Sequence, residues 1–142
     1  MWKRSFINLM TILGVSLLAN TPVWAGVGVG LNINVGIPLP PPIEVAAPPS
    51  MVYLAEPGVY VAVAVPYDLF FVGGRYYYYH GNRWFWARGY GGPWVHIASR
   101  SVPWGLRRYD INRLHAYRER EFRRYTMEGS RYHGRHFAAA RG

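Results

Sequence analysis

Residues 69–88 read LFFVGGRYYYYHGNRWFWAR, and the expected fold follows from this segment. Short runs of aromatic and β-branched residues, which favour β-strands, are separated by Gly73-Gly74 and by Gly81-Asn82. Residue pairs of this kind form two-residue turns between antiparallel strands. The stretch therefore predicts two consecutive β-hairpins that share their middle strand.

The two turns also predict the register of the strands. Residues at equal distances from a two-residue turn face each other across the hairpin. The expected pairs are His80–Arg83, Tyr79–Trp84, Tyr78–Phe85 and Tyr77–Trp86 in the second hairpin, and Phe71–Tyr76 and Phe70–Tyr77 in the first.

Side chains alternate between the two faces of a strand, so this register sorts the residues into two sets. We call the first set the aromatic face: Phe70, Val72, Arg75, Tyr77, Tyr79, Trp84, Trp86 and Arg88. The opposite face carries Leu69, Phe71, Tyr76, Tyr78, His80, Arg83, Phe85 and Ala87. The opposite face is richer in Leu, Phe and Ala and is expected to be the core side.

The aromatic face is a candidate binding surface. Its Trp and Tyr rings have apolar bodies and polar edges, and arginines flank them, a combination that suits a surface. Its candidate residues are Tyr77, Tyr79, Trp84, Trp86, Arg75 and Arg88. Three interpretations stay open. The rings can be covered and belong to the core, they can be exposed and stack on a glycan or another envelope component, or they can mediate self-association.

The flanking sequence predicts a mainly β fold with a C-terminal helix. Residues 51–98 hold further short strand-like runs between turns, which predicts a small antiparallel meander closed into a barrel-like or rolled sheet. Residues 26–50 alternate Gly and Val and then become Pro-rich, as expected for an extended arm. The other expected segments are a loop at 99–108, a basic amphipathic helix at 109–128 with Asp110 as its N-cap, and a disordered basic tail at 129–142.

Residues 1–25 match a secretory signal peptide. MWKR is a short basic start, an apolar run follows, and Val23 and Ala25 are the small residues expected before a cut after Ala25. A retained anchor helix is the alternative, although the apolar run is short for a membrane span. The sequence thus predicts an exported protein of the periplasm or the outer-membrane surface.

Charge predicts what such a protein attracts. Once Lys3 and Arg4 leave with the signal peptide, 14 Arg stand against 7 acids, a net charge of +7. Acidic surfaces are the expected partners, and export makes nucleic acid an unlikely one. The candidate contacts on the helix are Arg113, Arg118, Arg120, Arg123 and Arg124, unless they form only a solvated charged face.

Residues that could carry a reaction are sparse, and the sequence predicts no enzyme, cofactor or metal site. The acids of the β region, Glu56 and Asp68, stand beside turn prolines, and nothing brings them together. His133 and His136 could bind a metal only weakly from a loose tail. A hydrolase or a metal-binding protein is therefore a minor alternative to a structural or interaction module. The chain has no Cys, so no disulfide stabilises it.

The chain resembles a group of small exported, uncharacterised proteins of Gram-negative bacteria. Their pattern, D-x-F-F-x-x-G-x-[YW]-[YW] followed by an aromatic strand and G-P-W-V, matches Asp68 to Tyr77, Trp84 to Trp86 and Gly92 to Val95. The spacing departs by one residue between Gly81 and Trp84. The resemblance implies an envelope location and a small aromatic β module, and it implies no catalytic residue.

Overall fold

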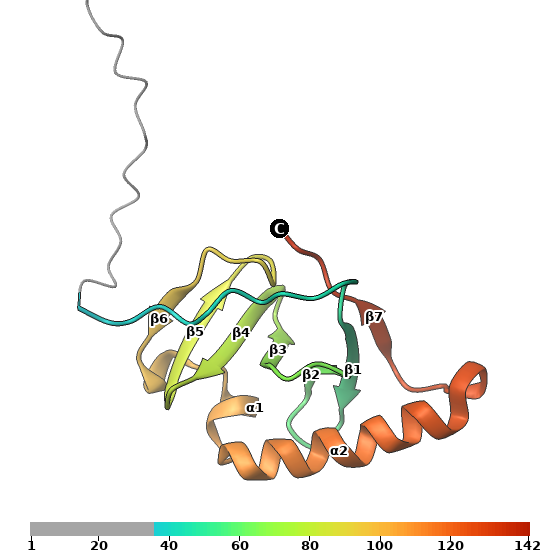
Figure 1. Ribbon diagram of the computed structural model, residues 1–142. Helices are drawn as coiled ribbons and strands as arrows, with labels where there is room; N and C mark the ends of the chain where they lie inside the picture. Colours follow the sequence, from blue (N-terminus) through green and yellow to red (C-terminus); the bar gives the residue numbers. More distant parts are fainter. Residues whose placement is uncertain (1–35) are drawn as a thin grey trace, which may run out of the picture. The chain divides into compact units, whose positions relative to one another are not determined.

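The structure is a computed structural model, which describes residues 36–142. Seven strands form one antiparallel sheet in the order β6-β5-β4-β3-β2-β1-β7 (Figure 1). The strands are β1 (Ser50–Leu54), β2 (Val59–Val63), β3 (Asp68–Val72), β4 (Arg75–His80), β5 (Arg83–Ala87), β6 (Val95–Ile97) and β7 (His136–Ala138). The helices are η1 (Ser99–Ser101), α1 (Trp104–Arg107), α2 (Ile111–Glu128) and η2 (Gly129–Arg131). The expected signal peptide and the first part of the arm lie outside the described residues.

The predicted hairpin register is confirmed. All six expected pairs occur, from His80–Arg83 in the β4–β5 hairpin to Phe70–Tyr77 in the β3–β4 hairpin. Gly81 and Asn82 have φ of 56° and 60°, the left-handed backbone that a tight hairpin turn of this kind requires. The prediction of a mainly β fold with one long helix is confirmed as well. The sheet is not closed into a barrel, because β6 and β7 are its two edges.

Both faces of the sheet are covered, which corrects the expectation of a single core side. On the aromatic face, Phe70 and Tyr77 pack with Leu106 of α1 and Leu114 of α2. On the opposite face, a second apolar cluster includes Ile43 of the Pro-rich segment. The sheet therefore separates two cores. Aromatic residues at consecutive strand positions point to opposite faces, and each face offers them apolar partners.

The Pro-rich segment that precedes β1 runs along the sheet and packs against it (Figure 1). Ile43 is 4% exposed, and the backbone of Glu44 exchanges two hydrogen bonds with the Tyr67 hydroxyl, at 3.1 and 3.2 Å. From residue 36 onward the arm is thus a cover for the core rather than a free spacer. Fixed proline φ angles lower the entropy lost when such a segment is ordered.

The predicted helix is α2, and Asp110 caps it as expected. The Asp110 carboxylate accepts a hydrogen bond from the Arg113 N–H at 3.0 Å. The helix packs on β1 and β2 through a narrow buried stripe that includes Leu114 and Tyr117. Arg118 lies in the same stripe because it pairs with Asp68 of β3 at 3.1 Å. The charge inside the apolar stripe is therefore an anchor of the helix to the sheet.

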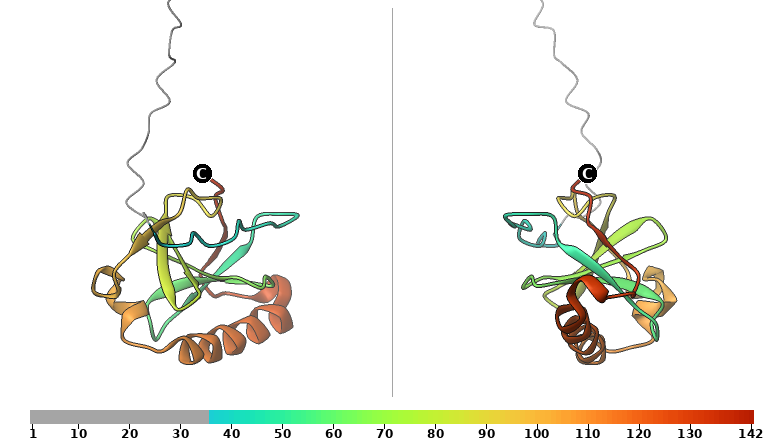
Figure 2. Two further views of the ribbon diagram at one scale, coloured as in Figure 1. Left: turned by 60° about the vertical axis from the view of Figure 1, so that its left-hand side comes forward. Right: turned by 90° about the vertical axis from the view of Figure 1, so that its right-hand side faces the viewer.

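The C-terminal segment 129–142 is ordered, so the expectation of a disordered tail is wrong. Its residues form η2 and then β7, which pairs antiparallel with β1 through the partners Met51–Phe137. Beyond β7 the chain follows residues 89–91, where the N–H of Tyr90 donates to the Ala140 carbonyl at 3.0 Å (Figure 2). The expected loop at 99–108 likewise contains two short helices, η1 and α1.

Candidate functional site

Part of the aromatic face remains accessible because α2 packs on β1 and β2 at the other end of the sheet. Trp84 and Trp86 of β5 and Tyr79 of β4 are half-buried there. Arg75, at the start of β4, is exposed beside them. We call these four residues, Arg75, Tyr79, Trp84 and Trp86, the aromatic patch.

The rings of the patch are held in place from below and from the side. Trp84 contacts the buried Phe70 ring at a centroid distance of 5.7 Å and the Tyr79 ring at 5.0 Å. The Tyr79 hydroxyl donates to the Asn82 side chain in the hairpin turn at 3.1 Å. The Arg75 guanidinium lies 4.6 Å from the centre of the Trp86 ring. The arrangement is a row of preformed ring edges with a cation at one end.

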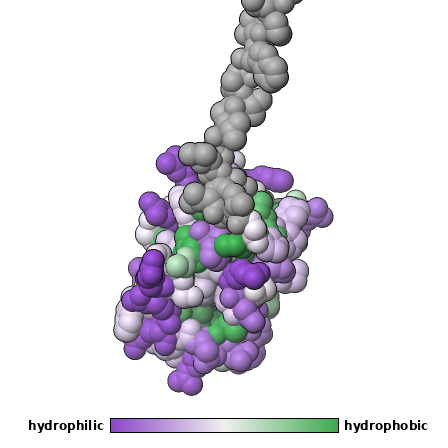
Figure 3. Space-filling model, turned by 90° about the vertical axis from the view of Figure 1, so that its left-hand side faces the viewer, coloured by the Kyte–Doolittle hydropathy of each residue, from purple (hydrophilic) through white to green (hydrophobic). Residues whose placement is uncertain are grey.

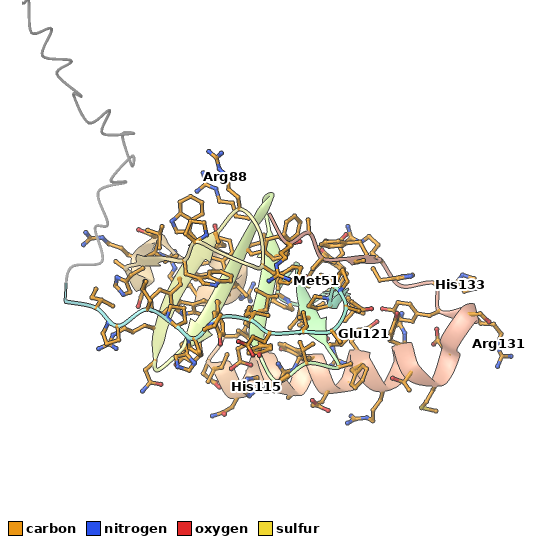
Figure 4. The ribbon with its side chains drawn as sticks, turned by 45° about the horizontal axis from the view of Figure 1, so that its top comes forward. Met51, Arg88, His115, Glu121, Arg131 and His133 are labelled. Carbon is orange, nitrogen blue, oxygen red and sulfur yellow. The ribbon has the colours of Figure 1, made fainter. Side chains whose placement is uncertain are left out.

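Two of the six candidate binding residues are not part of the aromatic patch. Tyr77 is 7% exposed and belongs to the core beneath α1 and α2. Arg88 is exposed and points away from the sheet (Figure 4). Tyr77 is therefore a core residue, whereas Tyr79, Trp84 and Trp86 keep part of their surface exposed.

The surface of the domain on the β6 side is mixed. Apolar residues form separate spots between hydrophilic ones instead of one continuous area (Figure 3). Tyr and Trp are amphipathic, so a patch made of them does not require a dry partner. This composition suits a reversible contact better than a permanent interface.

The arginines of α2 are largely engaged with acids of the same domain. Arg118 pairs with Asp68, Arg120 with Glu56, and Arg124 with both Glu121 and Glu128. Arg113 contacts the Tyr117 hydroxyl at 3.2 Å, and Arg123 is exposed with no ion pair among residues 36–142. Paired charges attract an acidic surface less than free ones, so the helix has less basic surface than its sequence indicates.

A polar pocket of about 330 Å³ lies between α2, the end of β1 and the segment that leads into β7. Its charged lining residues largely neutralise one another. The Arg135 guanidinium stacks on the Tyr53 ring at 3.3 Å. Next to the pocket, the buried Tyr132 hydroxyl donates to the Glu121 carboxylate at 2.5 Å. The lining is Tyr53, Ala55, Glu56, Arg120, Glu121, Arg124, Gly134 and Arg135.

Buried tyrosines give the fold a pH dependence at alkaline pH. Burial and the hydrogen bond to Glu121 raise the pKa of Tyr132, and burial raises the pKa of Tyr76 and Tyr78. Phenols of the unfolded chain release their protons near pH 10, where these three keep theirs in the folded chain. The contribution of these three tyrosines to stability is therefore fully present below about pH 10. It is expected to be lost as the pH rises through their folded-state pKa values.

Alkaline titration of phenol absorbance checks this expectation. Three of the 12 tyrosines should ionise only together with unfolding, and Tyr132→Phe should reduce the loss of stability above pH 10. Twelve tyrosines that titrate near pH 10 while the far-ultraviolet circular dichroism stays native would contradict the burial of these hydroxyls.

No group of three or more His, Cys, Asp or Glu side chains within residues 36–142 is placed to hold a metal ion. His136 instead contacts the Gly134 carbonyl at 2.9 Å and the rings of Tyr125 and Tyr132, while His133 is exposed near the end of α2 (Figure 4). Within the same residues, no helix is long and apolar enough to cross a bilayer.

Sequence reasoning missed two features. His115 of α2 joins Arg118 at Asp68, with its Nε2 2.7 Å from the carboxylate, whereas the sequence placed Asp68 only beside a turn proline. An Arg within a helical apolar stripe is the signal that an acid lies opposite. The second feature is Trp104, a Trp in the expected loop, which is 63% exposed and precedes Arg107 and Arg108.

No protein-family model, curated protein or solved structure matches this chain.

Proposed function

We propose that the protein is an exported, non-catalytic interaction module of the cell envelope, which contacts its partner through the aromatic patch. The observation that carries the proposal is the row Tyr79–Trp84–Trp86 with Arg75 over its last ring. The rings are fixed by a regular hairpin and by Phe70 beneath them, so little entropy is lost when a ligand binds.

A glycan of the envelope is the partner that this chemistry favours. Trp and Tyr rings provide apolar area for the faces of sugar rings, and their polar edges tolerate a wet interface. A guanidinium at the end of the row can bind a sugar carboxylate through two parallel hydrogen bonds. An envelope protein and a second copy of the chain are the alternatives, which the test below distinguishes.

The test is cosedimentation with purified peptidoglycan sacculi, and in parallel with an insoluble acidic polysaccharide. Trp86→Ala is expected to weaken binding about ten-fold or more, as for the central residue of an interface. Arg75→Gln keeps the fold, because Arg75 is exposed, and should weaken binding to the acidic polysaccharide. Cosedimentation of the wild type with neither glycan, or equal cosedimentation of wild type and Trp86→Ala, would overturn the glycan assignment.

Arg83→Gln is the matched control. Arg83 is exposed in the same hairpin, but its side chain belongs to the opposite face of the sheet. Its removal changes the net charge as much as Arg75→Gln does and should leave binding unchanged. Sedimentation equilibrium of the same variants tests self-association, since a dimer made through the patch would dissociate in Trp86→Ala.

A further inference from the structure

Trp104 forms a second exposed aromatic site. It lies on α1, whereas the aromatic patch lies on β4 and β5, and the two share no residue. It is the first residue of α1 and is 63% exposed. The Arg107 and Arg108 guanidinium groups lie 5.5 and 5.7 Å from the centre of its ring. Arg107 also donates to the backbone carbonyl of the exposed Arg100 at 2.8 Å. We call these four residues, Arg100, Trp104, Arg107 and Arg108, the Trp104 corner.

The corner stands on a rigid support. The next residue, Gly105, lies so close to the Pro57 carbonyl that an added Cβ would overlap the oxygen. Leu106 follows and is fully buried in the core. Backbone hydrogen bonds from the N–H groups of Leu106 and Arg107 to the Pro103 carbonyl close the turn. Trp104 is therefore held outward by packing on either side of α1, and its exposure is a fixed property of the fold.

The charges of the corner are not neutralised by acids. No Asp or Glu occurs in the sequence between Asp68 and Asp110, a stretch that contains six arginines: Arg75, Arg83, Arg88, Arg100, Arg107 and Arg108. Within residues 36–142, Arg107 and Arg108 form no ion pair, in contrast to Arg118, Arg120 and Arg124 of α2. Asp110, the next acid along the chain, is the N-cap of α2, and its carboxylate accepts a hydrogen bond from the Arg113 N–H. The helix α1 and its C-cap thus carry two arginines next to an exposed ring, without an ion pair in the described part of the chain.

We propose that the Trp104 corner docks the domain on an anionic lipid bilayer. Indole rings concentrate at the level of the lipid headgroups, where the apolar body and the polar N–H are both accommodated. Arg binds phosphate oxygens in bidentate geometry, and basic residues near an anionic leaflet add to membrane binding in proportion to their number. A projecting ring with cations around it fits a broad, deformable anionic surface.

A lipid surface explains the corner better than a polysaccharide or a protein does. A sugar chain is bound by a row of rings, which the aromatic patch offers and a lone Trp does not. A protein partner needs about 800 Å² on each side with a buried apolar centre, and the corner presents one apolar ring among charges. The proposal is independent of the proposed glycan contact, which uses other residues on another element.

The test is cosedimentation of the full-length protein with phosphatidylcholine vesicles prepared with and without phosphatidylglycerol. All variants carry the same N-terminal segment, so its contribution cancels. Binding is expected to be stronger with phosphatidylglycerol than without it. Trp104→Ala should lower the association constant about ten-fold, and the double change Arg107→Gln/Arg108→Gln by about five-fold for each charge. Both variants should keep the native circular dichroism, since the side chains are exposed.

Arg123→Gln/Arg131→Gln is the matched control. It removes two exposed arginines from the C-terminal half of α2 and from η2, where Arg131 lies at the far end of the helix (Figure 4). At physiological salt the control should change binding about two-fold or less, because charges beyond the Debye length are screened. A control defect as large as that of Arg107→Gln/Arg108→Gln would mean that net charge alone attracts the protein and would overturn the proposal.

Quenching by brominated phosphatidylglycerol shows which ring enters the headgroup region. Bound wild type should lose part of its Trp fluorescence, and Trp104→Phe should reduce this quenched part. Quenching that is undiminished in Trp104→Phe would show that Trp104 stays outside the bilayer and would contradict the assignment. A defect of Trp104→Ala towards a soluble acidic polysaccharide, without any defect towards vesicles, would assign the corner to the polysaccharide instead.

Discussion

Phe70→Ala is expected to lower the free energy of unfolding by about 3–5 kcal/mol, the usual range for a buried Phe. Phe70 is 0% exposed, in the centre of β3. It faces Val61 and Tyr77 on the neighbouring strands and contacts the Trp84 ring of the aromatic patch. Removal of its ring leaves a cavity between the sheet and the two helices. Urea unfolding followed by circular dichroism measures the change.

Phe71→Ala is the matched control for this prediction. Phe71 is the next residue of β3, its side chain lies on the opposite face, and it is only half-buried. The loss of stability should be clearly smaller than for Phe70, since part of the ring already contacts water. Equal losses for the two variants, or a loss below about 1 kcal/mol for Phe70→Ala, would show that the aromatic face is not a closed core beneath α1 and α2.

Removal of residues 135–142 is expected to destabilise the domain by at least about 3 kcal/mol. Each lost backbone hydrogen bond contributes roughly 1 kcal/mol, and the change breaks those from Tyr53 to Arg135 and from Ala139 to Pro49. It also exposes Met51, which is 0% exposed and faces Phe137. The free edge of β1 should then pair with other chains, so aggregation should increase.

A pair of point variants distinguishes the contribution of side-chain packing from that of the backbone pairing of β7. Phe137→Ser should reproduce part of the loss, because the Phe137 ring packs against Tyr60 and Phe71 at 5.0 and 5.1 Å. Ala138→Ser, at the next residue, is exposed and should be neutral. Hydrogen exchange of the Tyr53 amide reports the pairing directly. Fast exchange in the wild type would show that the C-terminal strand is not bound, and would restore the interpretation of a loose tail.

The two hairpins, including their strand register, could be predicted from the sequence because of their two-residue turns. Gly73-Gly74 and Gly81-Asn82 tolerate the positive φ of tight hairpin turns, and the aromatic runs beside them have high β propensity. Once both turns are placed, every cross-strand pair follows from counting. The start of α2 at Asp110 is local in the same sense, because a capping side chain reaches a backbone N–H three residues away.

The candidate site could be predicted only in part. The sequence placed Arg75, Tyr79, Trp84 and Trp86 on one face, because strand alternation is local. Whether that face contacts water depends on where α2 packs. The helix covers β1 and β2, so the three rings stay half-exposed and Arg75 stays exposed. Tyr77 has the same parity and the same chemistry, yet it is buried beneath the helices.

The local features of the fold, namely the strands, their turns, their register and the capped helix, thus follow from the sequence. Which surfaces are covered follows only from the packing of distant segments. Ile43 and Phe137 lie far along the chain from the hairpins they cover, and Arg118 enters the apolar stripe only because Asp68 faces it across the fold. The physical reason is that alternation and propensity act between neighbours in sequence. Burial, by contrast, depends on apolar contacts between segments whose separation in the chain carries no such pattern.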